Sequence, residues 1–250
     1  MDLQLKGRTA LVTGASQGIG NTLARLLALE GVTVAAAARR LEKVEELAEN
    51  VRAEGGHILP IRADLYEENA PERLAADAQE KLGSIDILMN VAGGSRPLSF
   101  DAPKDQWEEG MVLNFFRLRE LTHAVIPGMR ERKWGRIVNF TGTSEPRMLN
   151  AAFTAKAAVH IWAKGMSREV AADNITINCL QPGRIRSEQI LKRYPTPESE
   201  REFAEAEIPM LRFGEPKEIA EIAVFLASGP ASYVTGTVIP VDGGMSRFAF

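Results

Sequence analysis

Short apolar runs alternate with longer amphipathic segments along this sequence. The apolar runs are rich in Val, Ile, Leu and Ala, and they predict seven β-strands, at residues 9–13, 32–37, 57–63, 85–92, 135–141, 175–181 and 237–241. Most of them are apolar throughout, instead of alternating apolar with polar positions. Such strands are typical of a parallel sheet whose two faces are both covered by helices.

The segments between the strands predict helices. Apolar residues recur every three or four positions within residues 41–51, on a segment that is otherwise charged. Pro71 and Pro216 suit the first turns of two further helices, which we expect to end near Leu82 and Leu226. Strands separated in this way indicate a doubly wound α/β fold, a Rossmann-type three-layer sandwich that forms one domain over residues 1–250.

One segment has a different character. Residues from about 184 to 212 are charged and contain Pro195, Pro197 and Pro209. They follow the sixth predicted strand, and ligands in doubly wound folds bind beyond the carboxyl ends of the strands. We interpret this segment as a flap over the site, while a plain surface excursion stays open as the alternative.

Composition excludes some classes of partner. Hydrophobic residues make up 45% and charged residues 25% of the 250 residues, and the net charge of −3 gives no electrostatic case for nucleic acid or an anionic membrane. Cys179 is the only cysteine, which rules out an intramolecular disulfide, and its apolar surroundings favour a buried structural thiol. His57, His123 and His160 are too scattered to predict a metal site.

Targeting signals are the next consideration. The first residues, MDLQLKGR, contain no apolar stretch of the kind found in signal peptides, and no apolar run approaches the roughly 18 residues of a membrane-spanning helix. We therefore expect a cytoplasmic protein. A small-molecule substrate is the expected partner, because neither nucleic acid nor a membrane is favoured.

A glycine-rich motif follows the first predicted strand. The sequence TGASQGIG, residues 13–20, leads directly into a predicted helix. Gly14 permits a tight turn, Gly18 lets the backbone approach a pyrophosphate, and Gly20 allows close packing of helix on strand. The helix N-terminus then offers N–H groups to the phosphates. The motif predicts dinucleotide binding, because it lies between a strand and a helix in the first βαβ unit.

The end of the second predicted strand bears on the choice of nucleotide. NAD-binding proteins commonly place Asp or Glu there, on the ribose 2′-hydroxyl. This chain has Ala38 followed by Arg39 and Arg40. A guanidinium pairs well with a 2′-phosphate, so we expect NADP(H) to be favoured over NAD(H), with Arg39 as the contact. One of the two arginines is expected only to solvate the start of the following helix.

Seven motifs occur in the order typical of one family. They are TGASQGIG (13–20), MNVAGG (89–94), MVLNFF (111–116), GRIVNFTG (135–142), QPGRI (181–185), RFGEPKEIA (212–220) and VTGTVIPVDGG (234–244). Over nearly its whole length, the sequence resembles a classical short-chain dehydrogenase/reductase. The resemblance implies a nicotinamide dinucleotide cofactor and oxidoreductase activity on a carbonyl or alcohol.

The resemblance also implies which residues hold the nucleotide. Asp64 resembles the residue that contacts the adenine, and Asn90 and Gly93 resemble the segment that lines the ribose. Ile185 resembles the residue whose backbone meets the nicotinamide carboxamide, and Ser187 stands where a Thr often binds the cofactor. The full expected set is Gly14, Ser16, Gly18, Ile19, Gly20, Arg39, Asp64, Leu65, Asn90, Ala92, Gly93, Lys156, Pro182, Gly183, Ile185 and Ser187.

The catalytic part departs from the family pattern. Asn114 resembles the Asn that holds a water in a proton relay, and Lys156 resembles the Lys that binds the nicotinamide ribose and stabilises an ionised Tyr. That Tyr lies four residues before the Lys in the family, where this chain has Ala152. The family's Ser after the fifth strand is matched by Gly142. We expect an atypical active site in which another group moves the proton.

Several side chains are candidates for that role. Thr141, Thr143 and Ser144 each offer a hydroxyl near the position of the missing Ser, and a small shift of the alignment decides among them. Tyr194, in the flap, is a candidate for the replacement acid. His160 follows Lys156 by one helical turn and either faces the site or is a packed histidine.

Charged residues near the expected site allow two interpretations. Glu145 and Arg147 follow the fifth strand, so they bind a charged substrate, move a proton, or are only solvated loop charges. Arg184 and Arg186 flank Ile185 and are a second pair suited to an acidic substrate.

Three functions follow, in order of preference. The first is an NADP(H)-dependent oxidoreductase that acts on a carbonyl or alcohol with a non-standard proton donor. The second is a cofactor-binding pseudoenzyme or partner subunit, because two catalytic positions lack their hydroxyls. The third is a non-redox lyase or isomerase that uses Glu145 or a nearby group as base.

The resemblance further implies a homo-oligomer. Family members are commonly dimers or tetramers that associate through two long helices, expected here at about 105–131 and 150–172. We predict a homotetramer. The apolar C-terminal residues FAF are expected to pack against a neighbouring subunit.

Overall fold

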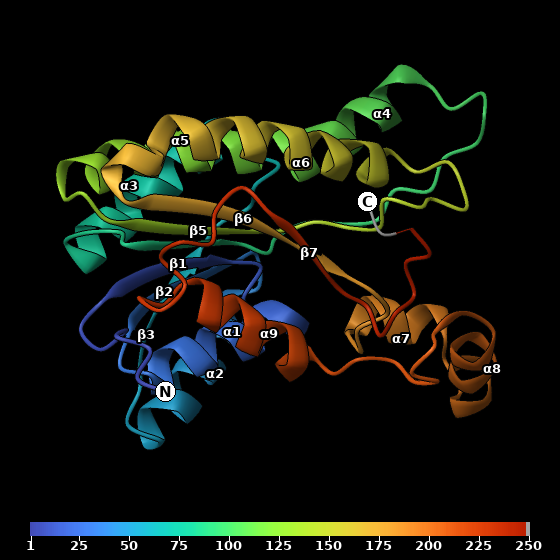
Figure 1. The fold of residues 1–250 in the computed structure, drawn as a ribbon, viewed down its shortest axis with the longest axis horizontal. Coiled ribbons are helices and arrows are strands. Elements are labelled where there is room, and N and C mark those ends of the chain that lie inside the picture. The colour runs from blue at the N-terminus through green and yellow to red at the C-terminus, as the bar shows by residue number, and fades with distance from the viewer. Residues whose placement is uncertain (249–250) are drawn as a thin grey trace.

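The computed structural model describes residues 1–248 and contains a single seven-stranded parallel sheet (Figure 1). The strand order is β3-β2-β1-β4-β5-β6-β7. The strands are β1 (Thr9–Thr13), β2 (Thr33–Ala38), β3 (His57–Arg62), β4 (Ile87–Asn90), β5 (Gly135–Phe140), β6 (Ile175–Pro182) and β7 (Val238–Val241). All seven predicted strands are present, which confirms the predicted doubly wound fold.

Helices cover both faces of the sheet. They are α1 (Gly18–Leu29), α2 (Leu41–Ala53), α3 (Ala70–Leu82), α4 (Lys104–Met111), α5 (Arg117–Glu131), α6 (Ala151–Val170), α7 (Glu188–Arg193), α8 (Pro197–Glu207) and α9 (Pro216–Leu226). Figure 1 shows α3, α5 and α6 on one face and α1, α2 and α9 on the other. Helices α7 and α8 lie beyond one end of the sheet, in the segment predicted to be a flap.

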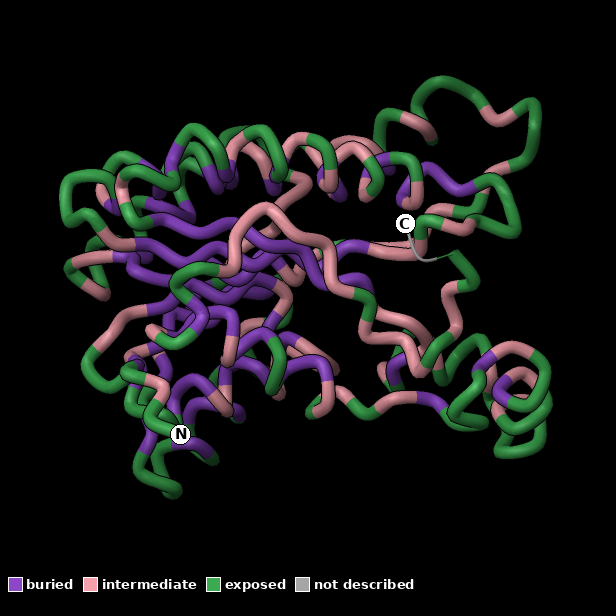
Figure 2. The backbone as a smooth tube through the Cα atoms, viewed as in Figure 1, coloured by how far each residue is buried: buried purple, intermediate pink, exposed green. Residues whose placement is uncertain are grey.

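The alternation of side chains along each strand divides the core into two layers. On β1, Ala10 and Val12 pack with the cluster formed by α1, α2 and α9, whereas Leu11 packs with the cluster under α3, α5 and α6. Figure 2 shows the central strands buried between these layers. Because both layers are apolar, the strands are apolar on both faces, as their sequence indicates.

The first predicted long helix is interrupted. Residues Val112–Phe116 form a π-helical turn, η1, between α4 and α5, so the expected helix at 105–131 consists of three joined parts. Such turns are rare and occur frequently at functional sites. The second long helix ends in a 3₁₀ turn, η2 (Ala171–Asp173).

The strand order reverses between β1 and β4, which places a crevice at the carboxyl ends of these neighbours. Thr13, at the end of β1, is buried there. Its hydroxyl donates to the carbonyl of Met89 and accepts from the N–H groups of Val91 and Ala92, at 3.3, 3.0 and 3.1 Å. These hydrogen bonds hold the segment after β4 against the start of the glycine loop.

Three further predictions concern the chain as a whole. Cys179 is buried on β6, and burial raises the pKa of its thiol to about 12, in agreement with a structural thiol. Among residues 1–248, no group of three or more His, Cys, Asp or Glu side chains is placed to hold a metal ion. Within that range, no helix is long and apolar enough to span a membrane.

Candidate active site

A first cavity of about 710 Å³ opens at the carboxyl ends of the strands, and the glycine loop forms one of its walls. All five predicted loop residues line it: Gly14, Ser16, Gly18, Ile19 and Gly20. Gly14 and Gly18 have φ angles of +70° and +55°, in the region that favours glycine. A Cβ on Gly20 would lie 2.3 Å from the carbonyl oxygen of Gly14, so the loop can close onto the helix only with glycine there.

The N-terminus of α1 is available to an anion. Its N-cap residue, Gln17, makes no side-chain cap hydrogen bond, and its first turn carries no acidic residue. The N–H groups of that turn and the positive end of the helix dipole therefore point toward the cavity without a competing carboxylate. This donor set fits the pyrophosphate of a dinucleotide.

Arg39 and Arg40 both line the first cavity, but their surroundings differ. Arg40 hydrogen-bonds Gln17, lies 3.4 Å from the Ser16 hydroxyl and forms an ion pair with Glu188 of α7 at 3.6 Å. Arg39 is exposed and forms no ion pair within residues 1–248. Of the two predicted candidates for the ribose phosphate, Arg39 is therefore the one without an ion-pair partner among the described residues.

The segment after β3 completes this cavity. Asp64 and Leu65 line it as predicted, and Tyr66 and Arg96 were not predicted to do so. Arg96 Nη2 donates to the Tyr66 hydroxyl at 2.5 Å and pairs with Glu109 at 2.6 Å. Burial raises the pKa of Tyr66, which keeps it a neutral phenol. One signal in the sequence indicated this contact: Arg96, a charged residue shortly after Gly93 and Gly94, which end the motif MNVAGG.

Two predicted asparagines lie behind the cavity walls. Asn90, contrary to the prediction, is buried in the sheet, where its amide donates to Thr122 Oγ1 at 3.0 Å and Asn139 Oδ1 at 2.9 Å. Asn114 is held in the π-helical turn, and its Oδ1 accepts from the N–H of Gly94 at 3.1 Å. Neither is among the described residues that line the two cavities. Asn114 contacts the segment after β4 through Gly94, whereas the Asn90 side chain is hydrogen-bonded to Thr122 and Asn139. Ala92 and Gly93 of that segment do line the first cavity.

A second cavity of about 560 Å³ adjoins the first and shares Ile19, Gly93 and Ser187 with it. Pro182, Gly183 and Ile185 line this cavity instead of the first. The two cavities therefore form one groove, in which the expected nicotinamide end of the cofactor site lies beside the expected substrate site.

Lys156 lines the second cavity. Its ammonium donates to the carbonyl of Thr141 at 3.2 Å. Burial lowers the pKa of Lys156 to about 8, because the charged form loses hydration that no carboxylate replaces. A pKa of about 8 allows the Lys156 amine, on the wall of this cavity, to be deprotonated near neutral pH.

Ala152 and Gly142 also line the second cavity, so the two departures from the family pattern face the same space as Lys156. Asn150 caps α6 by accepting the N–H of Ala152 at 2.9 Å, which fixes the first turn of the helix at the cavity wall. A Cβ on Gly142 would lie 3.4 Å from Cδ of Lys156, an ordinary contact. A Cβ at position 142 would therefore meet only side-chain atoms, of Lys156 and Phe153, and no backbone.

The three candidate hydroxyls are separated by their contacts. Thr141 Oγ1 donates to the carbonyl of Leu180 at 3.1 Å, so its proton is already used. Ser144 donates to Gln181 at 2.8 Å and is not among the described cavity-lining residues. Thr143 lines the cavity and accepts the N–H of Glu145 at 3.0 Å, which leaves its hydroxyl proton free to be donated.

Tyr194 is not placed to act as the acid. Its ring packs against Phe203 and Phe213, with centroids 5.0 and 5.3 Å away, in a small apolar cluster that holds α7 and α8 together. It is absent from the described linings of both cavities. The flap needs an apolar centre of its own because it lies outside the two main layers, and Tyr194 supplies part of it.

His160 is a packed histidine. Its Nε2 lies 2.8 Å from Thr141 Oγ1, and since that hydroxyl donates to Leu180, the imidazole N–H is the donor in this pair. Burial lowers the pKa of His160, which favours the neutral ring.

The contacts of Glu145 and Arg147 decide between the two interpretations of these charged residues. Glu145 accepts the N–H groups of Arg247 and Phe248 at 2.8 and 3.1 Å, and Arg147 pairs with Glu207. Neither side chain lines the second cavity within the part of the chain described. Both tie the loop after β5 to neighbouring segments.

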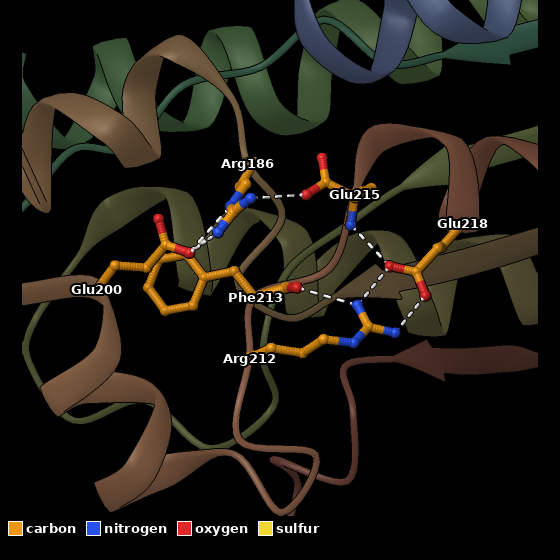
Figure 3. Close-up of polar contacts among 6 residues, drawn as sticks. All are labelled: Arg186, Glu200, Arg212, Phe213, Glu215 and Glu218. Atoms are coloured by element: carbon orange, nitrogen blue, oxygen red, sulfur yellow. Dashed lines mark hydrogen bonds and ion pairs between the residues drawn. The ribbon is translucent and has the colours of Figure 1, made fainter. Parts of the chain in front are cut away.

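Arg186 and Arg184 have opposite surroundings. Figure 3 shows Arg186 between Glu200 and Glu215, and its contact with Glu215 measures 3.0 Å. Arg184 lines the second cavity, with its guanidinium 4.9 Å from the ring centroid of Phe203.

Helix α7 contributes lining residues that sequence reasoning missed. Glu188 and Lys192 line the first cavity, Ile190 and Arg193 line the second, and Gln189 lines both. The available signal was Ser187, which caps the helix by accepting the N–H of Ile190 at 3.4 Å and thereby sets which side faces the groove. Ser187, for which a cofactor contact is predicted, itself lines both cavities.

The fold and the groove define a Rossmann-type nucleotide-binding protein with a substrate cavity beside the nucleotide site. Residues 14–246 match a family described as enoyl-(acyl carrier protein) reductase. The chain is similar to the 3-oxoacyl-(acyl-carrier-protein) reductase FabG of Pseudomonas aeruginosa, with 36% identity over 97% of this chain and 99% of that protein. It is also similar to the 7alpha-hydroxysteroid dehydrogenase of Escherichia coli K12, with 33% identity over 97% and 96% of the two chains.

The fold of this chain is also similar to those of solved dehydrogenases and reductases. The fold matches that of a 7α-hydroxysteroid dehydrogenase complexed with NADH and 7-oxo glycochenodeoxycholic acid, at a TM-score of 0.92, 31% identity, and coverage of 100% of this chain and 98% of the other. It matches L-sorbose reductase from Gluconobacter frateurii, complexed with NADPH and L-sorbose, at a TM-score of 0.94, 28% identity, and coverage of 99% and 100%. The chain belongs to the short-chain dehydrogenase/reductase family of oxidoreductases.

Proposed function

We propose that this protein is an NADP(H)-dependent oxidoreductase that interconverts a carbonyl and an alcohol, with Lys156 as its proton donor. The observation that carries the proposal is Lys156 itself: a partly buried amine on the wall of the second cavity, with its pKa lowered by burial to about 8 and Ala152 on the same wall. Arg39, which is free of ion pairs among the described residues, supports NADP(H) over NAD(H). A solved relative, L-sorbose reductase, was crystallised with NADPH.

The chain's own task is to manage the proton at the substrate oxygen. When bound, the nucleotide supplies a hydride to the carbonyl carbon and is oxidised as the carbonyl is reduced. The Lys156 ammonium gives its proton to the carbonyl oxygen, directly or through a water in the space beside Ala152. Thr143 donates its free hydroxyl proton to the same oxygen and orients it, which is the role that the family's Ser plays by resemblance.

The cofactor-binding pseudoenzyme stays open as the second candidate. It is favoured by one observation, that Ala152 and Gly142 both face the second cavity without a hydroxyl. A lyase or isomerase with Glu145 as base is less well supported, because the Glu145 carboxylate already accepts two backbone N–H groups. The homotetramer and the cytoplasmic location stay predictions. The predicted packing of residues 249 and 250 falls outside the described residues.

The first test is direct binding of NADPH and NADH to the purified protein, followed by nicotinamide fluorescence. We expect NADPH to bind tighter. Absence of binding of either nucleotide would contradict the proposal, and this measurement needs no knowledge of the substrate.

The second test is the pH dependence of turnover on a panel of carbonyl and alcohol substrates. Reduction needs the protonated amine, so its rate is full below the pKa of Lys156 and falls as the pH rises through about 8. Oxidation needs the neutral amine and changes in the opposite sense. A flat profile in both directions over this range would contradict Lys156 as the donor.

Lys156→Arg separates proton donation from nucleotide binding. Arginine keeps the positive charge but does not release its proton in this range, since its pKa lies above about 12. We expect NADPH binding to persist while reduction falls about 10²-fold or more, the usual contribution of an acid–base group. Lys156→Met, which removes the charge as well, is expected to weaken nucleotide binding too.

A further inference from the structure

The second cavity has a one-sided charge. Its described lining contains three ionisable side chains, Lys156, Arg184 and Arg193, and all three are bases. No Asp or Glu is among these lining residues. The remaining lining is mainly apolar, with Phe140, Met148, Phe153, Ile185 and Ile190 among its side chains.

The carboxylates around this cavity are already engaged with other partners. Glu200 and Glu215 both bind Arg186, as Figure 3 shows, and Arg186 is not among the described residues that line the cavity. Glu207 pairs with Arg147 and lies 3.6 Å from Arg247. The pKa of Glu207 is lowered mainly by its hydrogen bond with Arg147, and less by the charges of Arg247 and Arg184. The charge of Arg184 is therefore only partly offset, by a carboxylate that two other arginines already hold.

Arg184 is the central member of this set. Its Nε is buried and has no hydrogen-bond partner among the described residues, and the side chain forms no ion pair there. The ring of Phe203 from α8 supports the guanidinium at 4.9 Å, so the cation is held in place by a stacking contact. A buried donor without a partner calls for an acceptor, and a carboxylate matches the planar guanidinium with two parallel hydrogen bonds.

Arg193 extends the positive charge to the edge of the cavity. It is exposed on α7, and its guanidinium lies 6.0 Å from the ring centroid of Tyr194. It forms no ion pair within residues 1–248. An exposed cation at an entrance adds attraction for an anion at low ionic strength, and salt weakens this attraction.

We propose that the substrate is an oxo acid: a carbonyl compound whose carboxylate binds Arg184, with Arg193 at the entrance and the reacting carbonyl at Lys156. The proposal rests on the proposed function for the identity of the reacting group. The apolar side chains between the charged ends bind the carbon chain. In the reductive direction the C=O bond becomes CH–OH, with the hydride from bound NADPH and the proton from Lys156, while the carboxylate is unchanged.

The test uses the full chain saturated with NADP⁺, so that a carbonyl probe binds without being reduced. The probes are 4-oxopentanoate, 5-oxohexanoate and 6-oxoheptanoate, each paired with its neutral methyl ester, and binding is followed by calorimetry. We expect at least one acid to bind about tenfold or more tighter than its ester, as a charge-assisted contact implies. Higher salt should weaken binding of the acid and leave the ester unchanged.

Arg184→Gln is expected to abolish the preference for the acid, and Arg193→Gln to reduce it by a smaller factor. Arg186→Gln is the matched control, because Arg186 lies two residues away and is already paired with two glutamates. Equal binding of acid and ester, no binding of any acid, or a preference that survives in the Arg184 variant would overturn the proposal.

The same probes separate this proposal from the proposed function. If the acids bind through Arg184 but NADPH is never oxidised by them, the anion site stands and the oxidoreductase assignment fails. If neutral ketones are reduced at the rates of the acids, and Arg184→Gln reduces both equally, the oxidoreductase assignment stands and the oxo acid proposal fails.

Discussion

The two adjoining cavities of the groove are built from different parts of the chain. The shape of the first cavity depends on the backbone. Gly20 approaches the Gly14 carbonyl closely, Gly14 and Gly18 have positive φ angles, and the start of α1 has no side-chain cap. The second depends on the side chains of Lys156, Thr143 and Arg184, on a wall where Gly142 has room for a Cβ. A backbone site tolerates few substitutions, whereas a side-chain site changes its chemistry while the fold is retained.

This difference bears on the departure from the family pattern that the resemblance implies. An Ala at position 152 is compatible with an intact helix start, since Asn150 caps α6 there. The nucleotide cavity is unaffected because Ala152 does not line it within the described chain. We therefore expect a change of side chain at position 152 to alter the chemistry without altering nucleotide binding.

The largest expected effect comes from adding one methyl group to the backbone site. Gly20→Ala places a Cβ 2.3 Å from the Gly14 carbonyl oxygen, so the loop must move, and overpacking of this kind costs about 1–3 kcal/mol of stability. We expect NADPH affinity to fall by about 100-fold or more, equivalent to roughly 2.7 kcal/mol. Gly142→Ala is the control, and its affinity for NADPH should match that of the unaltered protein. Equal losses in both variants would contradict the contrast between the cavities.

The next largest expected effect is an increase in the rate of reduction. Ala152→Tyr combined with Gly142→Ser places two hydroxyls at positions that line the second cavity. Reduction should accelerate by about 10²-fold, at the lower end of what general acid catalysis contributes. NADPH affinity, measured in parallel, should stay within twofold, as expected if the chemistry can be changed by side chains alone. An unchanged rate together with intact NADPH binding would count against this view.

Arg39→Ala tests the one side chain on which the nucleotide preference is proposed to rest. Loss of a charge-assisted hydrogen bond costs about 1.5–3 kcal/mol, so NADPH binding should weaken by about 10- to 100-fold. NADH affinity should not change. Arg40→Ala is the comparison, because Arg40 is already bonded to the glycine loop and to Glu188. A larger loss of NADPH preference in Arg40→Ala would reverse the assignment of the two arginines.

The smallest effect separates two neighbouring hydroxyls in the second cavity. Thr143→Ala should lower turnover about two- to tenfold, the effect of a single neutral hydrogen bond. Ser144→Ala should leave turnover unchanged, because that hydroxyl is bonded to Gln181. Steady-state kinetics of both variants on one substrate decide between them. A larger loss of turnover in Ser144→Ala than in Thr143→Ala would indicate that Ser144, and not Thr143, contacts the substrate oxygen.

The strands, most helices and the nucleotide loop could be predicted from sequence, because apolar runs and glycine spacing are local signals. All five loop residues line the first cavity, and Arg39 and Asp64 line it as well. The flap was more difficult to predict. Its helices α7 and α8 are short and charged, and the orientation of Tyr194 depends on Phe203 and Phe213, which are remote from it in sequence.

The active site was also difficult to predict, because the roles of its side chains depend on hydrogen-bond partners that the local sequence does not indicate. Thr141, Thr143 and Ser144 are adjacent in sequence, and only tertiary contacts with Leu180, Glu145 and Gln181 distinguish them. Asn90 resembles a ribose contact by position, but its amide bonds within the sheet. A motif gives the residue type at a position, whereas the direction of its side chain depends on the packed neighbours.

Helix α7 is six residues long and contributes side chains to both cavities, with Gln189 lining the two together. A nucleotide in the first cavity and a substrate in the second, as proposed, would both contact this one helix. In steady-state kinetics, we therefore expect nucleotide and substrate to bind and leave in a compulsory order, and not independently of each other. Product inhibition would then be competitive between the two forms of the nucleotide, and an inhibitor held under α7 in the second cavity would slow nucleotide release.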